Sequence, residues 1–138
     1  MVVPIVTPTQ KKISLYSDFH KDLTQNPISL DLAVKRDEEA VKESLKNLIL
    51  TNKGERLFQP LLGGNIAAQL FENNTPATIK LIQEQVKSTI LQYEPRAQLI
   101  DVVVQSSIDN NKVEITIYFY ITNIEQPITV TVFLERTR

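Results

Sequence analysis

The chain has 138 residues, of which 42% are hydrophobic and 22% charged, and its formal net charge is −1. This length suits a single domain with one core, and the near-zero charge gives no electrostatic reason to expect a nucleic-acid partner. The absence of cysteine excludes disulfides and thiolate chemistry, and the single histidine, His20, excludes a multi-histidine metal site, so we expect no metal and no cofactor.

The first 30 residues predict an extended arm in front of a single domain that spans residues 31–138. Pro4, Pro8 and Pro27 interrupt any helical period in the arm. Several arm residues are too apolar for a fully solvated tail, so part of the arm would lie against this domain or a neighbour, with a frayed terminus as the equal alternative. They include Ile13, Leu15, Tyr16 and Phe19.

The chain start lacks the basic and apolar regions of a signal peptide. No segment approaches the roughly 18 apolar residues that a membrane span needs. We therefore expect the protein to be made and folded in the cytoplasm, without a membrane partner.

A first helix is predicted from Asp37 to about residue 52. Asp37 would be its N-cap, and the acidic residues Glu38 and Glu39 complement the positive helix start. Apolar residues recur on one face, at Val41, Leu45, Leu48 and Ile49. Gly54 is most simply the C-cap of this helix.

Two further helices should follow. The second carries apolar residues at helical spacing, at Ile66, Ala67, Leu70 and Phe71. Thr75-Pro76 starts the third, because a hydroxyl can cap the helix and proline suits its first turn. The third helix has an apolar stripe typical of a core face, at Ile79, Ile82, Val86 and Ile90.

The third helix ends in a charged turn, Tyr93-Glu94-Pro95-Arg96. Pro95 stops the helix and moves Glu94 out of the helical region, so the two flanking charges take fixed directions. Spacing alone favours the simpler arrangement, in which Glu94 and Arg96 pair with each other or with a helix end. The functional alternative is that the fixed charges are presented to a partner.

Three strand patterns fill the rest of the chain. Residues 99–104 form a β-branched run, Asn110-Asn111 suits a tight turn, and residues 113–122 alternate apolar and polar side chains. After Pro127 the apolar positions are Ile128, Val130, Val132 and Leu134. Helices followed by hairpin strands indicate an α+β fold, with about three helices on one face of a three-stranded antiparallel sheet.

The last strand should form an open sheet edge, whose unpaired N–H and C=O groups can pair with a strand of another chain. An equal alternative is that Glu135, Arg136 and Arg138 are gatekeeping charges that keep the edge solitary. The same edge would also suit a free-standing adaptor that binds one peptide strand.

Signatures of catalysis are thin, since there is no G-x-S-x-G motif and no phosphate-cradling glycine loop. A glycoside hydrolase of the lysozyme type needs only two carboxylates. Candidates are Glu55, Glu72, Glu94 and Asp101. Nothing in the sequence places one of them in an apolar pocket that would raise its pKa, so we expect no enzyme.

Short motifs follow one another in a fixed order: Asn52-Lys53-Gly54-Glu55-Arg56-Leu57-Phe58-Gln59-Pro60, Leu62-Gly63-Gly64, Leu70-Phe71-Glu72 and Tyr93-Glu94-Pro95-Arg96. In order and spacing they resemble the phage baseplate wedge family, the sheath initiator of contractile tails. That family is similar to a baseplate subunit of type VI secretion systems and is often labelled lysozyme-like. The resemblance covers about residues 30–134. The chain departs from the family's common Pro-x-Phe-Gly pattern at Pro60-Leu61-Leu62-Gly63.

The resemblance implies a structural role without turnover, in a virion tail baseplate assembled in the host cytoplasm. The partners would be other baseplate wedge proteins and the tail sheath protein, with six copies of the chain in the baseplate and no nucleic acid or membrane. The turn formed by Glu94, Pro95 and Arg96 would dock on the wedge proteins. The last strand would pair with sheath strands, at Ile128, Val130, Val132 and Leu134.

The other motif residues are expected to be structural: Gly54, Glu55, Arg56, Phe58, Pro60, Gly63 and Phe71. Glu55 and Arg56 would pair internally or orient the following loop. Leu57, Phe58 and Phe71 should lie in the core rather than at a contact surface.

Overall fold

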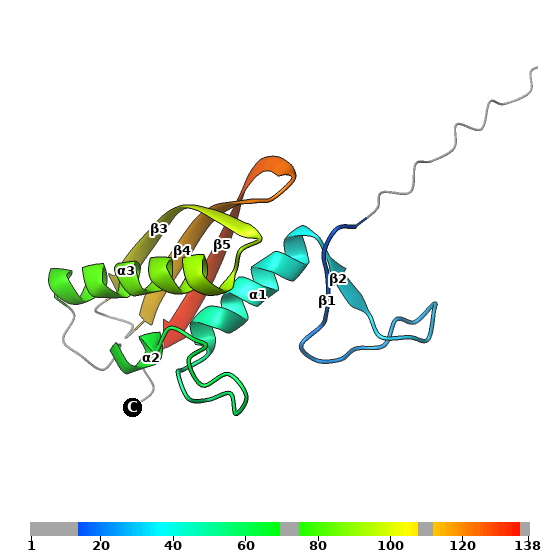
Figure 1. Ribbon diagram of the computed structural model, residues 1–138, viewed down its shortest axis with the longest axis horizontal. Helices are drawn as coiled ribbons and strands as arrows, with labels where there is room; N and C mark the ends of the chain where they lie inside the picture. Colours follow the sequence, from blue (N-terminus) through cyan, green and yellow to red (C-terminus); the bar gives the residue numbers. More distant parts are fainter. Residues whose placement is uncertain (1–13, 70–74, 108–111, 136–138) are drawn as a thin grey trace, which may run out of the picture.

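The computed structural model describes residues 14–69, 75–107 and 112–135 (Figure 1). In chain order the elements are β1 (Ser17–Phe19), β2 (Val34–Arg36), α1 (Glu38–Leu50), α2 (Ile66–Gln69), α3 (Pro76–Tyr93), β3 (Ala97–Ser107), β4 (Lys112–Ile121) and β5 (Ile124–Glu135). The predicted α+β class is confirmed, with helices packed on one face of an antiparallel sheet in the order β3-β4-β5. Expectations outside the described residues concern Pro4, Pro8, Ile13, Leu70, Phe71, Glu72, Asn110, Asn111, Arg136 and Arg138.

The buried face of α1 is the predicted one, but both ends of the helix differ from expectation. Asp37 holds the N-cap position without capping the helix, and its Oδ1 instead accepts hydrogen bonds from the backbone N–H groups of Leu15 (2.8 Å) and Tyr16 (3.3 Å). At the other end Thr51 is the C-cap, and its hydroxyl donates to the carbonyl of Asn47 at 2.6 Å. The C-cap role predicted for Gly54 is therefore wrong, because the chain leaves the helix three residues earlier.

Helix α3 begins and ends as its sequence predicts. The hydroxyl of Thr75 accepts the N–H of Thr78 at 3.2 Å, and Pro76 stands in the first turn. The last helical residue is Tyr93, and the N–H of Glu94 still donates to the carbonyl of Ile90 at 2.9 Å. Pro95, which cannot continue this ladder, follows directly.

The strands β4 and β5 follow the predicted alternation, but β5 begins earlier than expected. Thr122 and Asn123 form a two-residue turn, in which Asn123 takes a left-handed φ of 74°. The register shift between Phe119 and Ile121 then lets β5 accommodate Pro127, which has no N–H for the ladder. The inward-facing side chains of both strands are buried, and they are Val113, Ile115, Ile117, Phe119, Ile121, Ile128, Val130, Val132 and Leu134.

One core joins the helices and the sheet. Helix α3 packs along β3, and α1 contacts α3 and β5, so that both helices cover the same sheet face (Figure 1). The helical side of this core consists mainly of Val41, Leu45, Ile49, Ile66, Ile82, Val86 and Ile90. No described helix covers the opposite face of the sheet, where Tyr118, Tyr120 and Phe133 are exposed.

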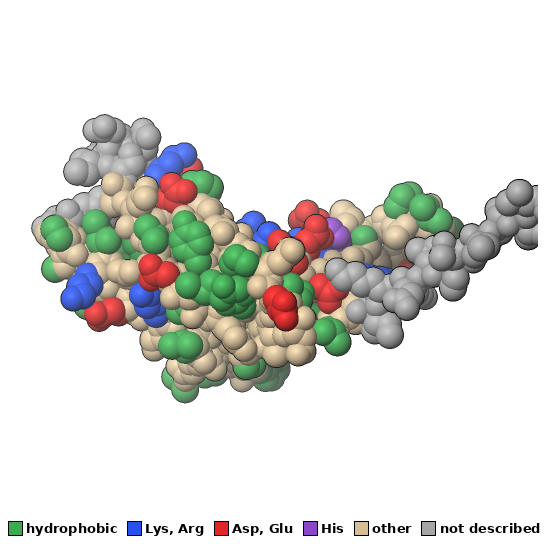
Figure 2. Space-filling model, turned by 90° about the horizontal axis from the view of Figure 1, so that it is seen from above, with side chains coloured by type: hydrophobic (Ala, Val, Ile, Leu, Met, Phe, Trp, Pro, Cys, Tyr) green, Lys and Arg blue, Asp and Glu red, His purple; other side chains and the backbone are tan. Residues whose placement is uncertain are grey.

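Residues 17–36 form an N-terminal hairpin that the sequence did not predict. Strand β1 pairs with β2 in antiparallel register, from Ser17 opposite Arg36 to Phe19 opposite Val34. The hairpin projects away from the body beyond the start of α1 (Figure 1), and hydrophobic side chains are exposed at its far end (Figure 2). Strand β1 lies in the expected arm, and its partner β2 lies in the expected domain. The division of the chain at residue 30 stays a prediction.

Candidate functional site

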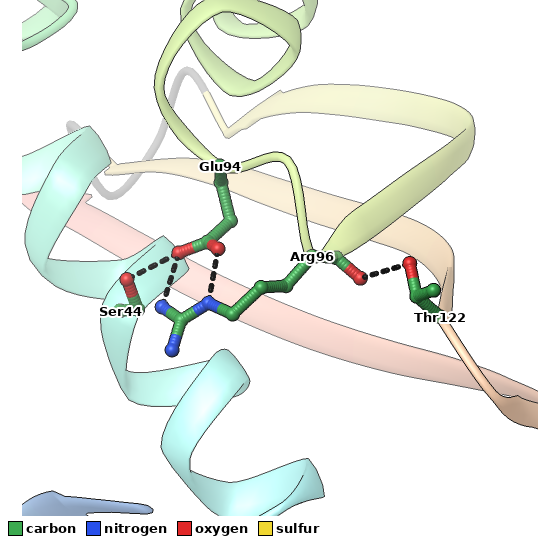
Figure 3. A network of polar contacts seen from close by, with 4 residues as sticks. All are labelled: Ser44, Glu94, Arg96 and Thr122. Carbon is green, nitrogen blue, oxygen red and sulfur yellow. Dashed lines mark hydrogen bonds and ion pairs between the residues drawn. The ribbon is translucent and has the colours of Figure 1, made fainter. Parts of the chain in front are cut away.

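The charged turn after α3 is built around a forked ion pair (Figure 3). The Nε of Arg96 donates to Oε1 of Glu94 at 2.6 Å, and its Nη2 donates to Oε2 at 2.7 Å. Ser44 on α1 donates its hydroxyl to the same Oε2. The pair therefore joins the end of α3, the start of β3 and the middle of α1.

The backbone of the same turn is also held. The carbonyl of Arg96 accepts the N–H of Thr122 at 3.1 Å and its hydroxyl at 3.4 Å (Figure 3). This contact fixes the turn between β4 and β5 to the start of β3. The Tyr16 ring lies under the guanidinium of Arg96, 5.7 Å from centroid to Cζ, within cation–π range. The residue just before β1 thus contacts the turn as well.

Burial decides how the two charges can act. The side chain of Glu94 is 3% exposed and that of Arg96 is 30% exposed, while Pro95 is exposed. The internal pairing that the spacing favoured is what the structure shows. Glu94 faces inward, so the surface of the turn consists of Pro95 and the outer side of Arg96.

The pKa of Glu94 reflects this competition between burial and pairing. Burial alone would raise the pKa of Glu94, but the hydrogen bonds from Arg96 and Ser44, together with the charge of Arg96, hold it below its ordinary value. The pKa of Arg96 is raised by its hydrogen bonds to Glu94 despite partial burial. Both groups are therefore charged at neutral pH.

The second motif forms the loop between α1 and α2. Gly54 adopts a φ of +86° and donates its N–H to the carbonyl of Pro60 at 2.7 Å. The carboxylate of Glu55 accepts the N–H of Asn52 at 2.8 Å, so it orients the loop and does not pair with Arg56. At Gly63, with φ +116°, a Cβ would lie 2.3 Å from the carbonyl oxygen of Thr51, so the loop can close only on glycine.

The core position expected for Leu57 and Phe58 is wrong. Leu57 is 92% exposed and Phe58 97% exposed, because the hydrogen-bonded loop turns outward and carries both to its tip. Pro60 is exposed beside them. The sequence around these residues has no helical or strand periodicity, so it does not predict their exposure. Only the structure of the outward turn shows that they are exposed.

The two motifs meet at a cleft of about 190 Å³. It is lined by Asp18, Ser44, Asn47, Leu48, Arg56, Leu62 and Tyr93. The hydroxyl of Tyr93 donates to the carbonyl of Leu61 at 2.8 Å, which ties the loop to the end of α3. Residues from the hairpin, α1, the loop and the turn are thus brought to one side of the molecule.

The three candidate catalytic carboxylates that the structure describes are not brought together as an acid and nucleophile, and Glu72 lies outside the described residues. Glu94 is held by Arg96, Glu55 caps its own loop, and Asp101 pairs with Lys87 at 2.9 Å. The hydrogen bond from Lys87 is the main cause that lowers the pKa of Asp101. A general acid needs a raised pKa, whereas the pKa values of Glu94 and Asp101 are both lowered.

Over residues 14–69, 75–107 and 112–135, no group of three or more His, Asp or Glu side chains is arranged to hold a metal ion. In the same ranges no helix combines the length and the apolar character needed to cross a bilayer. Strand β5 is one edge of the described sheet, where it pairs only with β4, and β3 is the other edge. The side chains of Ile128, Val130, Val132 and Leu134 point into the core.

The fold is thus a helix-backed antiparallel sheet with an open edge at β5, and its charged motifs hold the fold together. Residues 35–125 match the family described as "Baseplate wedge protein gp25", and the chain belongs to this family. It is 32% identical over 105 residues to the baseplate wedge protein gp25 of Enterobacteria phage T4, covering 76% of this chain and 79% of the relative. It is thus a structural component of the baseplate wedge of contractile tails, and other baseplate proteins are its partners.

Solved structures share the fold. A putative tail lysozyme from Geobacter sulfurreducens superposes with a TM-score of 0.70 at 22% identity, over 78% of this chain and 97% of that one. The baseplate of the anti-feeding prophage contains a chain with a TM-score of 0.62 at 24% identity, over 86% of this chain and 83% of that one. In the baseplate complex of the type VI secretion system the TM-score is 0.54 at 18% identity, over 70% of this chain and 92% of that one.

Removing Arg96 should destabilise the isolated protein. Arg96→Ala leaves the carboxylate of Glu94 buried without its main partner, and we expect a loss of about 2 kcal/mol in the free energy of unfolding. Arg96→Lys keeps the charge but not the fork and should lose about 1 kcal/mol. Urea unfolding measures both, with Lys80→Ala on the exposed side of α3 as the control; an Arg96→Ala protein as stable as wild type would contradict a structural role for the pair.

The pair should also stabilise the protein in a pH-dependent way. Because the folded-state pKa of Glu94 is lowered, its contribution is complete above the unfolded-state pKa of roughly 4.3 and is lost as the pH falls through the lower folded-state value. The stability difference between wild type and Glu94→Gln should therefore be largest at neutral pH and shrink below about pH 4. Urea midpoints between pH 7 and pH 3 test this, and a constant difference would show that the carboxylate charge is not the stabilising feature.

Proposed function

We propose that this protein is the wedge subunit on which the tail sheath begins to polymerise, and that it does so by offering the edge of β5 to sheath strands. The observation that carries the proposal is the open, twelve-residue edge of β5 in a member of the baseplate wedge family. The protein would be assembled in the host cytoplasm, in six copies per baseplate, without nucleic acid or membrane.

The build of β5 supports strand addition. Its inward-facing side chains, at Ile128, Val130, Val132 and Leu134, are fixed in the core, which leaves main-chain groups along the outer edge for a partner. Glu135 pairs with Lys112 on β4 at 2.6 Å, so this charge is directed along the sheet instead of standing alone as a gatekeeper. Ladder hydrogen bonds would supply affinity, and the alternation of side chains would fix the register.

The turn of Glu94, Pro95 and Arg96 is the second contact in this proposal, and its three residues have different roles. Glu94 positions Arg96 from inside, and Pro95 with the outer side of the guanidinium faces the other wedge proteins. Nη1 of Arg96 makes no hydrogen bond to the described residues and can donate to a carbonyl or carboxylate of a partner. No turnover is part of this role, and no cofactor is required.

An adaptor that binds one free peptide strand would use the same edge of β5. Family membership favours the baseplate role over this alternative, because the match spans residues 35–125, which include the turn, β3, β4 and the first two residues of β5. A lysozyme-type hydrolase is disfavoured by the lowered pKa values of Glu94 and Asp101.

Strand addition predicts a change in amide hydrogen exchange along β5. In the free protein, the N–H groups that point away from β4 should exchange quickly while those bonded to β4 are protected. Adding purified sheath protein should slow the exchange of the N–H groups that point away from β4, which belong to every second residue between 128 and 134. Exchange of the N–H groups bonded to β4 should not change. Binding of sheath without new protection in β5 would contradict pairing at this edge.

Docking through the turn predicts a loss of affinity without a loss of stability. Pro95→Ser removes an exposed contact but keeps the fork, so the melting temperature should change little while affinity for purified wedge proteins falls about tenfold. Thr129→Ser, on the exposed side of β5, is the control for that affinity. Unchanged binding by Pro95→Ser would place the wedge contact elsewhere.

A further inference from the structure

The tip of the loop between α1 and α2 carries two neighbouring apolar side chains that are almost completely exposed. Phe58 is 97% exposed, Leu57 is 92% exposed, and Leu61 nearby is 72% exposed. A single exposed leucine is ordinary in a folded protein, but a phenylalanine and a leucine side by side at a tip form an apolar group that marks an interaction site. When a partner buries such an aromatic side chain, that residue typically contributes a large share of the affinity of the interface.

The loop holds this tip in one conformation. The N–H of Gly54 donates to the carbonyl of Pro60 at 2.7 Å across the base, and the N–H of Gln59 donates to the carbonyl of Arg56 at 3.2 Å across the tip. The Tyr93 hydroxyl fixes the carbonyl of Leu61 to the end of α3. A preformed loop loses little conformational entropy on binding, so the tip is already shaped as a contact.

The charges around the tip define what it can bind. Lys53 and Arg56 make no side-chain hydrogen bond or ion pair with any residue in the described ranges, whereas the one acid of the tip, Glu55, is engaged with the N–H of Asn52. A complementary surface is therefore an apolar pocket with carboxylates at its rim. A symmetric tip-to-tip contact of two copies would bring Arg56 against Arg56, which like-charge repulsion disfavours.

We propose that the Leu57–Phe58 tip is a partner anchor that inserts into an apolar, carboxylate-rimmed pocket of a neighbouring baseplate protein. The tip lies close to the charged turn through the contact of Tyr93 with Leu61, and Arg56 lines the cleft that Ser44 and Tyr93 share. Both surfaces can thus engage one neighbour. The proposal rests on the place of the chain in the baseplate and not on the initiation of the sheath.

The test uses the full-length protein, each purified baseplate protein of the same tail, and the purified sheath protein as separate probes. Phe58→Ser should lower the affinity for one baseplate protein about 30-fold, with an unchanged melting temperature because the side chain is 97% exposed. Arg56→Glu should weaken the same complex and reduce its salt dependence. Leu91→Gln, which alters another exposed leucine (68%) on α3, is the matched control and should bind like wild type.

The outcomes separate this proposal from the sheath role. Loss of the baseplate complex with sheath binding intact supports the anchor, and loss of sheath binding alone overturns it. Equal binding of every baseplate protein by wild type and Phe58→Ser also overturns it, as does wild type that binds none of them. If light scattering shows a homodimer that Phe58→Ser dissociates, the tip binds a second copy and the proposal is wrong.

Discussion

The structure depends on the ion pair between Glu94 and Arg96, at the point where the helical layer passes into the sheet. Its carboxylate is almost completely buried, and a buried charge is tolerable only when its partners are complete. Arg96 supplies two of the hydrogen bonds, and Ser44 supplies one from a different helix. The fork and Ser44 thereby link α1 to the junction of α3 and β3, and the carbonyl of Arg96 extends this link to the β4–β5 turn at Thr122.

Three of the motif residues that suggested the family hold the fold together. Glu94 holds Arg96, Gly63 allows the loop to pass the backbone of Thr51, and Glu55 closes the loop by accepting a backbone N–H. The surfaces that we propose as contacts, at Pro95 and at the Leu57–Phe58 tip, belong to the same motifs and lie next to these three residues. Rigid motifs and adjacent contact residues are a consistent arrangement for a scaffold, because preorganisation lowers the entropic cost of assembly.

Sequence patterns predicted the parts of the fold that are governed by periodicity and by local signals. The Thr75-Pro76 start of α3 and the alternation of β4 were predicted correctly, and three of the four stripe residues of α3 are buried, whereas Ile79 is only partly buried. The hairpin was not predictable, because its three-residue strands are too short to show alternation. The chain just before β1 is also held by a hydrogen bond from the N–H of Leu15 to Asp37, and a contact over 22 residues leaves no local sequence signal. The exposure of Phe58 was missed for a related reason: an apolar residue in a loop carries no period that tells which side it faces.

The inward direction of Glu94 determines how assembly experiments on this turn can be interpreted. A substitution of Glu94 or Arg96 breaks the fork, so it changes the geometry of α1, α3 and β3 together with any partner contact, and loss of assembly would not identify a docking residue. Pro95 differs, because it is exposed and lies outside the fork. The fork already orders the side chain of Arg96. Its remaining donor can therefore bind a partner with little further loss of conformational entropy. In the docking that we propose, the ion pair is then a condition rather than the contact itself, and the contact lies at Pro95 and at the outer side of the guanidinium.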